Sequence, residues 1–478
     1  MFGSMLFPIF LGSVVLLFFL LPAKWRPAVL LFFSYIFCAY LSIAALACLL
    51  FVSATAWAAG LWISSLQTKG FIKKGRIVAA VAVSICVAML VVFKYAGSLT
   101  GWTGMSGTKA ETVLSQLVMP VGLSFYLFQV ISYLVDLAGG KIQVENNFWY
   151  LGCAFAFFPK LVSGPIERVQ DFLPQIKRLR GVKLLDRGRL SAAFTYLLWG
   201  YFMKMVVADR LAMQVGILFD RYQEFDSFFL VLGAFFYTVQ IYCDFAGYSY
   251  IAVGCAKIFG IDLTQNFQAP YQAQSITEFW RRWHVSLSSW LRDYLYIPLG
   301  GGRKGFCRKC VNIMIVFLVC GMWHGSGLSF IIWGILHGLY SVTDNLFRKK
   351  GWKMPAGRLI TFGEVAFAWI FFRAGNLGQA LSYIKRMFTA GIDWGKVQGA
   401  REILGLSGME ILVIGAGILM VFLMDERCSR RRMHFPFLVQ QEKNYVRYFV
   451  FYLLLISIFI FGIYGPGYHV EQFIYMQF

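Results

Sequence analysis

The sequence predicts an all-α polytopic membrane protein. Its 478 residues are 59% hydrophobic, 18% aromatic and only 14% charged, with a mean hydropathy of +0.65. A soluble domain carries about 25% charged residues. Apolar runs recur along nearly the whole chain, and basic residues are grouped in the short stretches between them. This pattern is typical of a chain that crosses a bilayer many times.

About 11–12 segments approach the length of about 20 residues that a helix needs to cross the hydrocarbon. The first has the apolar core of a signal peptide but lacks a basic start and a small-residue cleavage site, so we expect a retained span. Gly, Pro and Trp interrupt several others, so re-entrant or interfacial helices are expected as well. The predicted spans are residues 5–21, 27–42, 43–65, 77–95, 116–136, 190–209, 227–258, 311–323, 327–346, 358–373, 409–425 and 446–465.

The net charge of +21 lies in the loops between these spans. Lysine and arginine prefer cytoplasmic loops, so the charge predicts orientation and contact with membrane lipid rather than binding of nucleic acid. Both termini then lie outside a bacterial cytoplasmic (inner) membrane, provided that residues 145–165 enter the bilayer and return. The loops predicted to be cytoplasmic are Lys24/Arg26, Lys69–Arg76, Arg168–Arg189, Arg303–Lys309, Arg348–Arg358 and Arg427–Arg432.

No repeat, low-complexity linker or soluble domain is visible, so residues 1–478 are predicted to form a single integral-membrane domain. Most of the ten cysteines stand in apolar runs, where they behave as small hydrophobic residues. Cys307 and Cys310 form a CxxC pair, but no second pair completes a zinc tetrahedron. No metal site is predicted.

Three of the five histidines, His284, His324 and His337, fall within residues 284–337. Ionisable groups in an apolar run are costly to bury and are therefore candidates for function. A buried neutral imidazole suits a general base, which can take a proton from an alcohol that attacks a thioester. The alternative is a structural histidine that only satisfies a hydrogen bond.

The stretch from Thr277 to Gly302 differs in character from the spans. It reads TEFWRRWHVSLSSWLRDYLYIPLGGG and mixes tryptophans at helical spacing with Arg281, Arg282 and Asp293. An interfacial or re-entrant amphipathic helix that begins near Thr277 fits this composition. It either anchors the fold at the aromatic belt or forms one wall of an active-site funnel whose arginines contact phosphate or carboxylate.

Several motifs carry a resemblance to a known family. WHGSGLSFIIWGILHG resembles the signature of the membrane-bound O-acyltransferases, and SITEFWRRWHVSLSSWLRDYLYIPLGG is similar to that of their bacterial alginate and polysaccharide O-acetyltransferase branch. PVGLSFYLFQVISYLVD, FFPKLVSGPIER and YCDFAGYSYIAVG also resemble that branch. The resemblance implies helices around a central funnel and tunnel through the membrane.

The same resemblance assigns roles to individual residues. His324 matches the family's catalytic histidine, and His284 in the WRRWH motif matches a second functional histidine of the branch. His337 matches the last histidine of the W-G-x-x-H-G element, where a supporting role is expected. The predicted supporting or substrate-binding residues are Trp323, Trp280, Arg281, Arg282, Asp293, His337 and Asp244.

The two carboxylates in that set have structural alternatives. Asp293 stands beside Arg292 and either orients a neighbouring group or forms a local ion pair, while Asp244 lies in an apolar run and requires a partner. At the C-terminus, HVEQFIYMQF resembles short tails of the branch that end in FIYxxF. Tyr475 is therefore a candidate outer-side acyl relay, unless the aromatic tail only packs at the interface.

The expected activity is that of an O-acyltransferase, an enzyme with no bound cofactor. It uses an acyl thioester such as acetyl-CoA as donor, moves the acetyl group across the membrane, and serves O-acetylation of an exported polysaccharide such as alginate. A periplasmic or extracellular acetyltransferase partner protein is expected to complete the transfer.

Two alternatives remain. The same fold can transfer D-alanine or another acyl group from a carrier protein to a cell-wall polymer. A transporter or flippase also combines broken apolar helices with buried polar groups, although such proteins more often show internal repeats.

Overall fold

The computed structural model describes residues 4, 6–102, 119–352 and 356–464 of the chain, and these are helical, with no strand among them. The protein is an all-α polytopic membrane protein, as predicted. Its contacts cluster into two compact units. We call them the N-terminal unit (residues 5–193 and 252–264) and the C-terminal unit (residues 1–4, 194–251 and 265–478). Whether they act as one integral domain stays a prediction.

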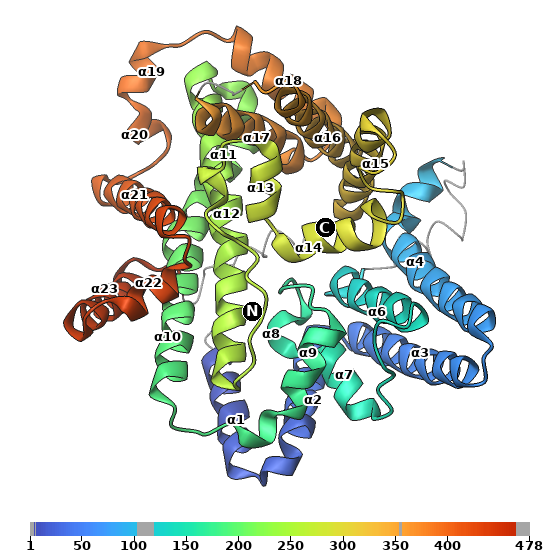
Figure 1. Ribbon diagram of the computed structural model, residues 1–478. Coiled ribbons are helices and arrows are strands. Elements are labelled where there is room, and N and C mark those ends of the chain that lie inside the picture. The colour runs from blue at the N-terminus through green and yellow to red at the C-terminus, as the bar shows by residue number, and fades with distance from the viewer. Residues whose placement is uncertain (1–3, 5, 103–118, 353–355, 465–478) are drawn as a thin grey trace. The chain divides into compact units, whose positions relative to one another are not determined.

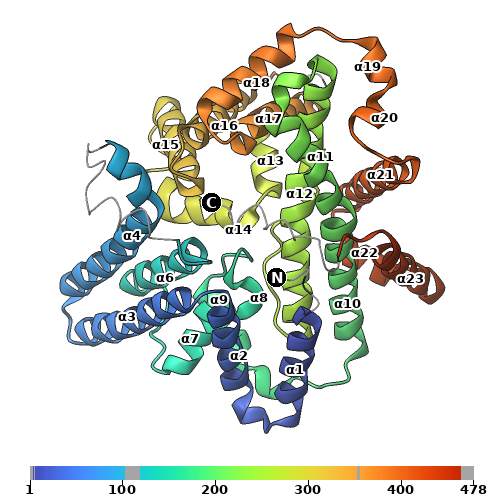
Figure 2. The same ribbon diagram turned by 180° about the vertical axis from the view of Figure 1, so that it is seen from behind.

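The N-terminal unit contains the first eight labelled α-helices of Figure 1. Both views show α3, α4 and α6 side by side (Figures 1 and 2). The helices are α1 (Leu6–Leu20), α2 (Arg26–Leu41), α3 (Ile43–Thr68), α4 (Ile72–Trp102), α6 (Leu123–Ala138), α7 (Phe148–Ala156), α8 (Phe158–Leu161) and α9 (Val169–Lys177), with short 3-10 turns η1 (Ala23–Trp25) and η2 (Leu179–Gly181).

Buried charges tie loops to helices in this unit. The guanidinium of Arg26 donates to the carbonyl oxygens of Leu179 and Val182, each at 2.8 Å. Lys160 is fully buried and donates to the carbonyl of Ala154 at 2.7 Å and to the side chain of Gln129. Because an unpaired cation in an apolar interior is costly, these contacts are needed for the unit to close.

Two long helices run from one unit into the other: α10 (Arg187–Tyr201) and α12 (Ser227–Ile258). The C-terminal unit adds η3 (Phe202–Ala208), α11 (Asp209–Asp220), η4 (Tyr222–Glu224), η5 (Pro270–Gln272), α13 (Ile276–Arg282), α14 (Val285–Leu291), η6 (Arg292–Tyr296), α15 (Phe306–His324), α16 (Leu328–Lys349), α17 (Gly357–Arg373), α18 (Leu377–Thr389), α19 (Trp394–Gln398), α20 (Ala400–Ile403), α21 (Gly408–Arg431), α22 (Phe435–Gln441) and α23 (Asn444–Phe461). The segments η3 and η6 are π-helical turns.

Each predicted span falls on a helix within the described part of the chain. By length and apolarity, six of these helices can cross a membrane, namely α3, α4, α12, α15, α21 and α23, and α1 and α6 are shorter apolar helices. Residues 145–165, predicted to enter and return, form the short helices α7 and α8, which are separated at Phe157. Neither is long enough to span a bilayer. The total of about 11–12 crossings stays a prediction.

The segment from Thr277 to Gly302, predicted to form an interfacial or re-entrant amphipathic helix, contains two short helices, α13 and α14. They are separated because His284 adopts the left-handed conformation with φ 43°. Asn266 holds this break: its carbonyl oxygen accepts from the amide of Val285, and its side-chain oxygen accepts from the amide of Ser286, both at 3.1 Å. These bonds satisfy amides at the start of α14 that lack partners within the helix.

Helices α15 and α16 form a close antiparallel pair, and both views place them side by side (Figures 1 and 2). Gly321 and Gly334 face each other at the crossing: a Cβ on Gly321 would lie 3.4 Å from the Cα of Gly334 and nearer still to the carbonyl oxygen of Phe330. A Cβ on Gly334 would meet the carbonyl of Phe317 in the same way. Small residues let helix backbones approach closely in membranes, and here two glycines are required.

We therefore expect Gly321→Ala and Gly334→Ala to lower the thermal unfolding temperature of the detergent-purified protein, because the added methyl groups force α15 and α16 apart. Gly415→Ala in α21 is the matched control, since no atom lies within 4 Å of its added Cβ. Alanine favours a helix over glycine by about 1 kcal/mol, so this control should unfold at the same or a higher temperature. Equal behaviour of all three variants would contradict the close crossing.

Candidate active site

His324 is the last residue of α15 and lies in an aromatic enclosure within the C-terminal unit. Its side chain is buried, and its ring centroid lies 4.8 Å from that of Trp323, 5.0 Å from that of Trp333 and 5.1 Å from that of Phe372. The helix ends here because Gly325 continues in an extended conformation. The site thus places an imidazole at a helix end, among rings that exclude water.

His337 lies on α16, one helical turn beyond Trp333, and is fully buried. The indole Nε1 of Trp280 donates a hydrogen bond to its Nδ1 at 3.3 Å. Because Nδ1 accepts, a neutral His337 carries its proton on Nε2. Among the described residues, that Nε2 has no hydrogen-bond partner. The ring centroid of Trp333 lies 5.0 Å from that of His324 and 4.8 Å from that of His337.

His284 occupies the break between α13 and α14 and is buried. Its ring lies edge-on to Phe245 at 4.7 Å and 6.2 Å from Trp323. Burial lowers the pKa of His284 to about 3, so its imidazole is neutral at neutral pH. A non-glycine residue in the left-handed region is uncommon and often marks a functional site.

The three predicted histidines are therefore brought together through tryptophan rings. The rings of His284 and His324 both lie near that of Trp323, and the rings of His324 and His337 both lie near that of Trp333. The predicted residues Trp280 and Trp323 belong to this cluster. Three imidazoles in a water-poor enclosure can accept and donate protons, which is the chemistry that acyl transfer to an alcohol requires.

The arginines of the WRRWH motif line a separate cavity of about 360 Å³. Arg282 is bound there, with an ion pair to Glu278 at 2.6 Å and a hydrogen bond to the hydroxyl of Ser429 at 3.0 Å. Arg281 is exposed and has neither an ion pair nor a hydrogen bond in the described part of the chain. The cavity is lined by Gln268, Glu278, Arg281, Arg282, Cys428, Ser429, Arg432, Met433 and His434. Its excess of arginine suits a phosphate-bearing ligand.

The two predicted carboxylates each have a cation. Asp244 on α12 pairs with Lys204 at 2.6 Å, and the same ammonium pairs with Asp209 at 2.7 Å. Asp293 on η6 pairs with the neighbouring Arg292 at 2.8 Å. Asp244 thus has the partner that its apolar setting requires. Tyr475, the candidate acyl relay, lies outside the described residues.

Sequence reasoning missed three residues that shape this region. Trp333 lies in the motif WHGSGLSFIIWGILHG, and its spacing of one helical turn from His337 indicates that the two side chains share a helix face. Lys204 stands in an apolar run, and the argument applied to Asp244 applies to it equally. Asn266 carried no signal, because its role depends on hydrogen bonds to residues about 20 positions away.

We expect Asp244→Ala to destabilise the C-terminal unit by about 3–5 kcal/mol, since it breaks a buried ion pair and leaves an incompletely compensated charge. Unfolding of the purified protein in detergent measures this loss. Glu224→Gln is the matched control, because Glu224 pairs with Arg221 at the exposed surface, where an ion pair contributes little. An unchanged stability of Asp244→Ala would show that the pair does not support the fold.

Comparison with known proteins gives two findings. The model of the MBOAT, membrane-bound O-acyltransferase family, matches residues 81–378. A protein of Pseudomonas putida named probable alginate O-acetylase AlgI is 36% identical over 396 residues, which cover 81% of this chain and 79% of that protein.

Two further relatives cover less of the chain. The peptidoglycan O-acetyltransferase of Helicobacter pylori is 35% identical over 332 residues, covering 63% of this chain and 62% of that protein. The teichoic acid D-alanyltransferase of Bacillus subtilis is 26% identical over 296 residues, covering 57% and 73%. Residues 81–378, which the family model matches, include all three clustered histidines.

Proposed function

Because the chain belongs to the membrane-bound O-acyltransferase family, we propose that it supplies acetyl groups for O-acetylation of an exported polysaccharide. The similar alginate and peptidoglycan O-acetyltransferases support a polysaccharide acceptor. The observation that carries the chemistry is the placement of His284 and His324 beside the same indole ring, that of Trp323. A multi-pass position in the inner membrane agrees with the apolar helices.

In the proposed reaction, His324 acts as the general base. Its neutral imidazole accepts the proton of an acceptor hydroxyl while the oxygen attacks the thioester carbonyl carbon. The carbon–oxygen bond forms, the carbon–sulfur bond breaks, and the departing thiolate takes the proton back from the imidazolium. The aromatic enclosure excludes water, which limits hydrolysis of the thioester.

His284 is proposed to hold or pass a proton beside this centre, and His337 to position the rings through its bond from Trp280. The donor is proposed to be acetyl-CoA or another acyl thioester, entering from the cytoplasmic side through a funnel and tunnel. A partner protein outside the membrane is proposed to complete transfer onto the polymer, and both termini are proposed to lie on that outer side. Tyr475 remains a candidate carrier for that last step.

We expect His324→Ala and His284→Ala to abolish polymer acetylation while the protein still inserts and purifies as a monodisperse species. His337→Asn is the comparison variant, since its side-chain amide oxygen lies near the position of Nδ1 and can still accept from Trp280. It should retain measurable transfer. Acetyl content of the isolated polymer provides the measurement, and full acetylation by the His324→Ala protein would overturn the mechanism.

The arginine-lined cavity is proposed to bind the phosphates of the donor. Arg281→Gln should raise the KM for acetyl-CoA about tenfold with little change in kcat, because it removes a charge-assisted bond made equally in the ground and transition states. Arg221→Gln removes an exposed arginine elsewhere in the unit and should leave KM unchanged. A fall in kcat alone would argue against a donor-binding role.

D-alanyl transfer from a carrier protein is the second candidate, favoured by the similarity to the D-alanyltransferase of Bacillus subtilis. The purified protein would be offered acetyl-CoA and a charged carrier protein in parallel. If only the thioester of the carrier protein is cleaved, the donor is the charged carrier protein and not acetyl-CoA. The fold and the proposed role of the histidines would be unaffected by that result.

A further inference from the structure

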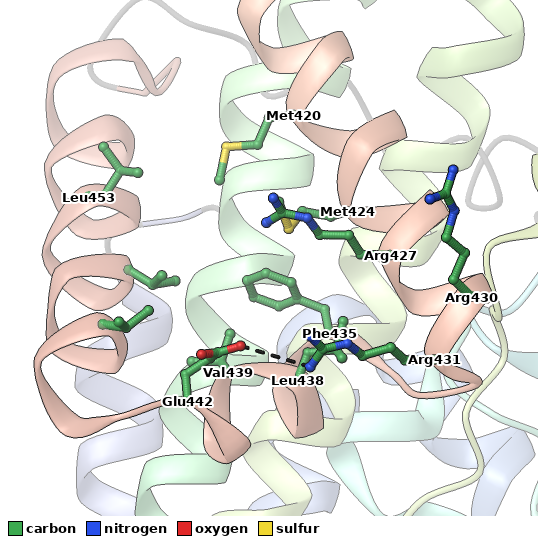
Figure 3. A pocket seen from close by; sticks show the side chains of 12 residues that line it. Met420, Met424, Arg427, Arg430, Arg431, Phe435, Leu438, Val439, Glu442 and Leu453 are labelled. Atoms are coloured by element: carbon green, nitrogen blue, oxygen red, sulfur yellow. Dashed lines mark ion pairs between the residues drawn. The ribbon is translucent and has the colours of Figure 1, made fainter.

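A second cavity, of about 540 Å³, lies between α21, α22 and α23 in the C-terminal unit (Figure 3). Its volume falls within the range of about 300–1,000 Å³ that small-ligand sites occupy. Its lining residues are Met420, Met424, Arg427, Arg430, Arg431, Phe435, Leu438, Val439, Glu442, Val446, Val450 and Leu453. None of them belongs to the histidine cluster or to the arginine-lined cavity beside α13.

The walls of this cavity are two helices that can each cross a membrane, α21 and α23. Met420 and Met424 lie one turn apart on α21, and Val446, Val450 and Leu453 repeat the same spacing on α23. Leu453 is 42% exposed, so this apolar wall is not covered by other parts of the unit. At membrane depth, such a space is filled by hydrocarbon.

One end of the cavity is basic. Figure 3 shows Arg427 reaching into the space between the two helices, whereas Arg430 points away from it. Arg430 is paired with Glu426 at 2.6 Å, and Arg431 faces Glu442 at 4.0 Å. Arg427 has no ion pair within the described residues. Glu442 is the acidic residue in the lining and it faces Arg431, so the positive charge of Arg427 has no counter-ion among the lining residues.

The turn between α21 and α23 closes the basic end. The short helix α22 contributes Phe435, Leu438 and Val439, which are buried and form an apolar floor. Arginines next to apolar residues at the end of a membrane span are typical of the depth at which lipid headgroups meet the hydrocarbon. The ligand that fits is therefore amphipathic and anionic.

We propose that this cavity binds an anionic glycerophospholipid from the surrounding membrane. Its phosphate lies against Arg427 and Arg431, and an acyl chain follows Met420 and Leu453 between α21 and α23. A soluble phosphate would use the arginines but leave the apolar walls without a role. A zwitterionic lipid would use the walls but leave Arg427 without a compensating net charge. The site is independent of the acyl-transfer chemistry proposed for the histidines.

The test measures lipid retention by native mass spectrometry, after the full-length protein in mild detergent is mixed with equal amounts of phosphatidylglycerol and phosphatidylcholine. The unaltered protein should retain phosphatidylglycerol in preference. Arg427→Gln should reduce that retention about fivefold, the effect expected for one basic residue at an anionic headgroup. Val450→Trp, which fills the cavity without changing charge, should reduce retention of both lipids.

Arg221→Gln is the control, because Arg221 is an exposed arginine paired with Glu224 and does not line the cavity, and it should retain phosphatidylglycerol unchanged. Inorganic phosphate at high concentration should not displace the lipid. Equal retention by Arg427→Gln and Arg221→Gln, no preference over phosphatidylcholine, displacement by phosphate, or undiminished binding by Val450→Trp would each overturn the proposal.

Discussion

The close crossing of α15 and α16 is the constraint on which the candidate site depends. Gly321 and Gly334 let the two backbones touch, and this contact sets the end of α15 beside the first turns of α16. His324 and His337 are therefore held close to one indole, that of Trp333. A wider crossing would open this enclosure to water and separate rings whose centroids now lie about 5 Å apart. The geometry of the candidate site thus depends on having glycine at these two positions.

A second requirement is that every charge in the apolar interior be compensated. Lys204 lies on the π-helical turn η3 and pairs with both Asp209 and Asp244. π-helical turns within helices are rare and occur often at functional sites. Here the turn connects α10 to α11. The ammonium of Lys204 on this turn is shared by two carboxylates from different helices. Asp244 precedes Phe245, whose ring packs on His284, so the ion pair and the histidine cluster share one stretch of α12.

Much of the fold could be predicted from the sequence, because long apolar runs bounded by charge dictate helices. The predicted span at residues 227–258 coincides with α12, and the sequence alone identifies His324, His284 and His337 as candidate site residues. The break at His284 could not be predicted, since tryptophans at helical spacing favour a continuous helix and the opposing hydrogen bonds come from Asn266. The aromatic enclosure also needs Phe372 from α17, a contact that no local pattern encodes.

The bond between Trp280 and His337 limits how protons can travel through this cluster. An indole nitrogen donates its hydrogen but cannot accept another or give its own away at ordinary pH. With Nδ1 occupied by that donor, His337 cannot exchange its tautomer, so a proton that reaches its Nε2 side has no onward route through the ring. His337 therefore cannot pass a proton onward through its ring. The proton relay proposed for this cluster would involve His324 and His284, and not His337.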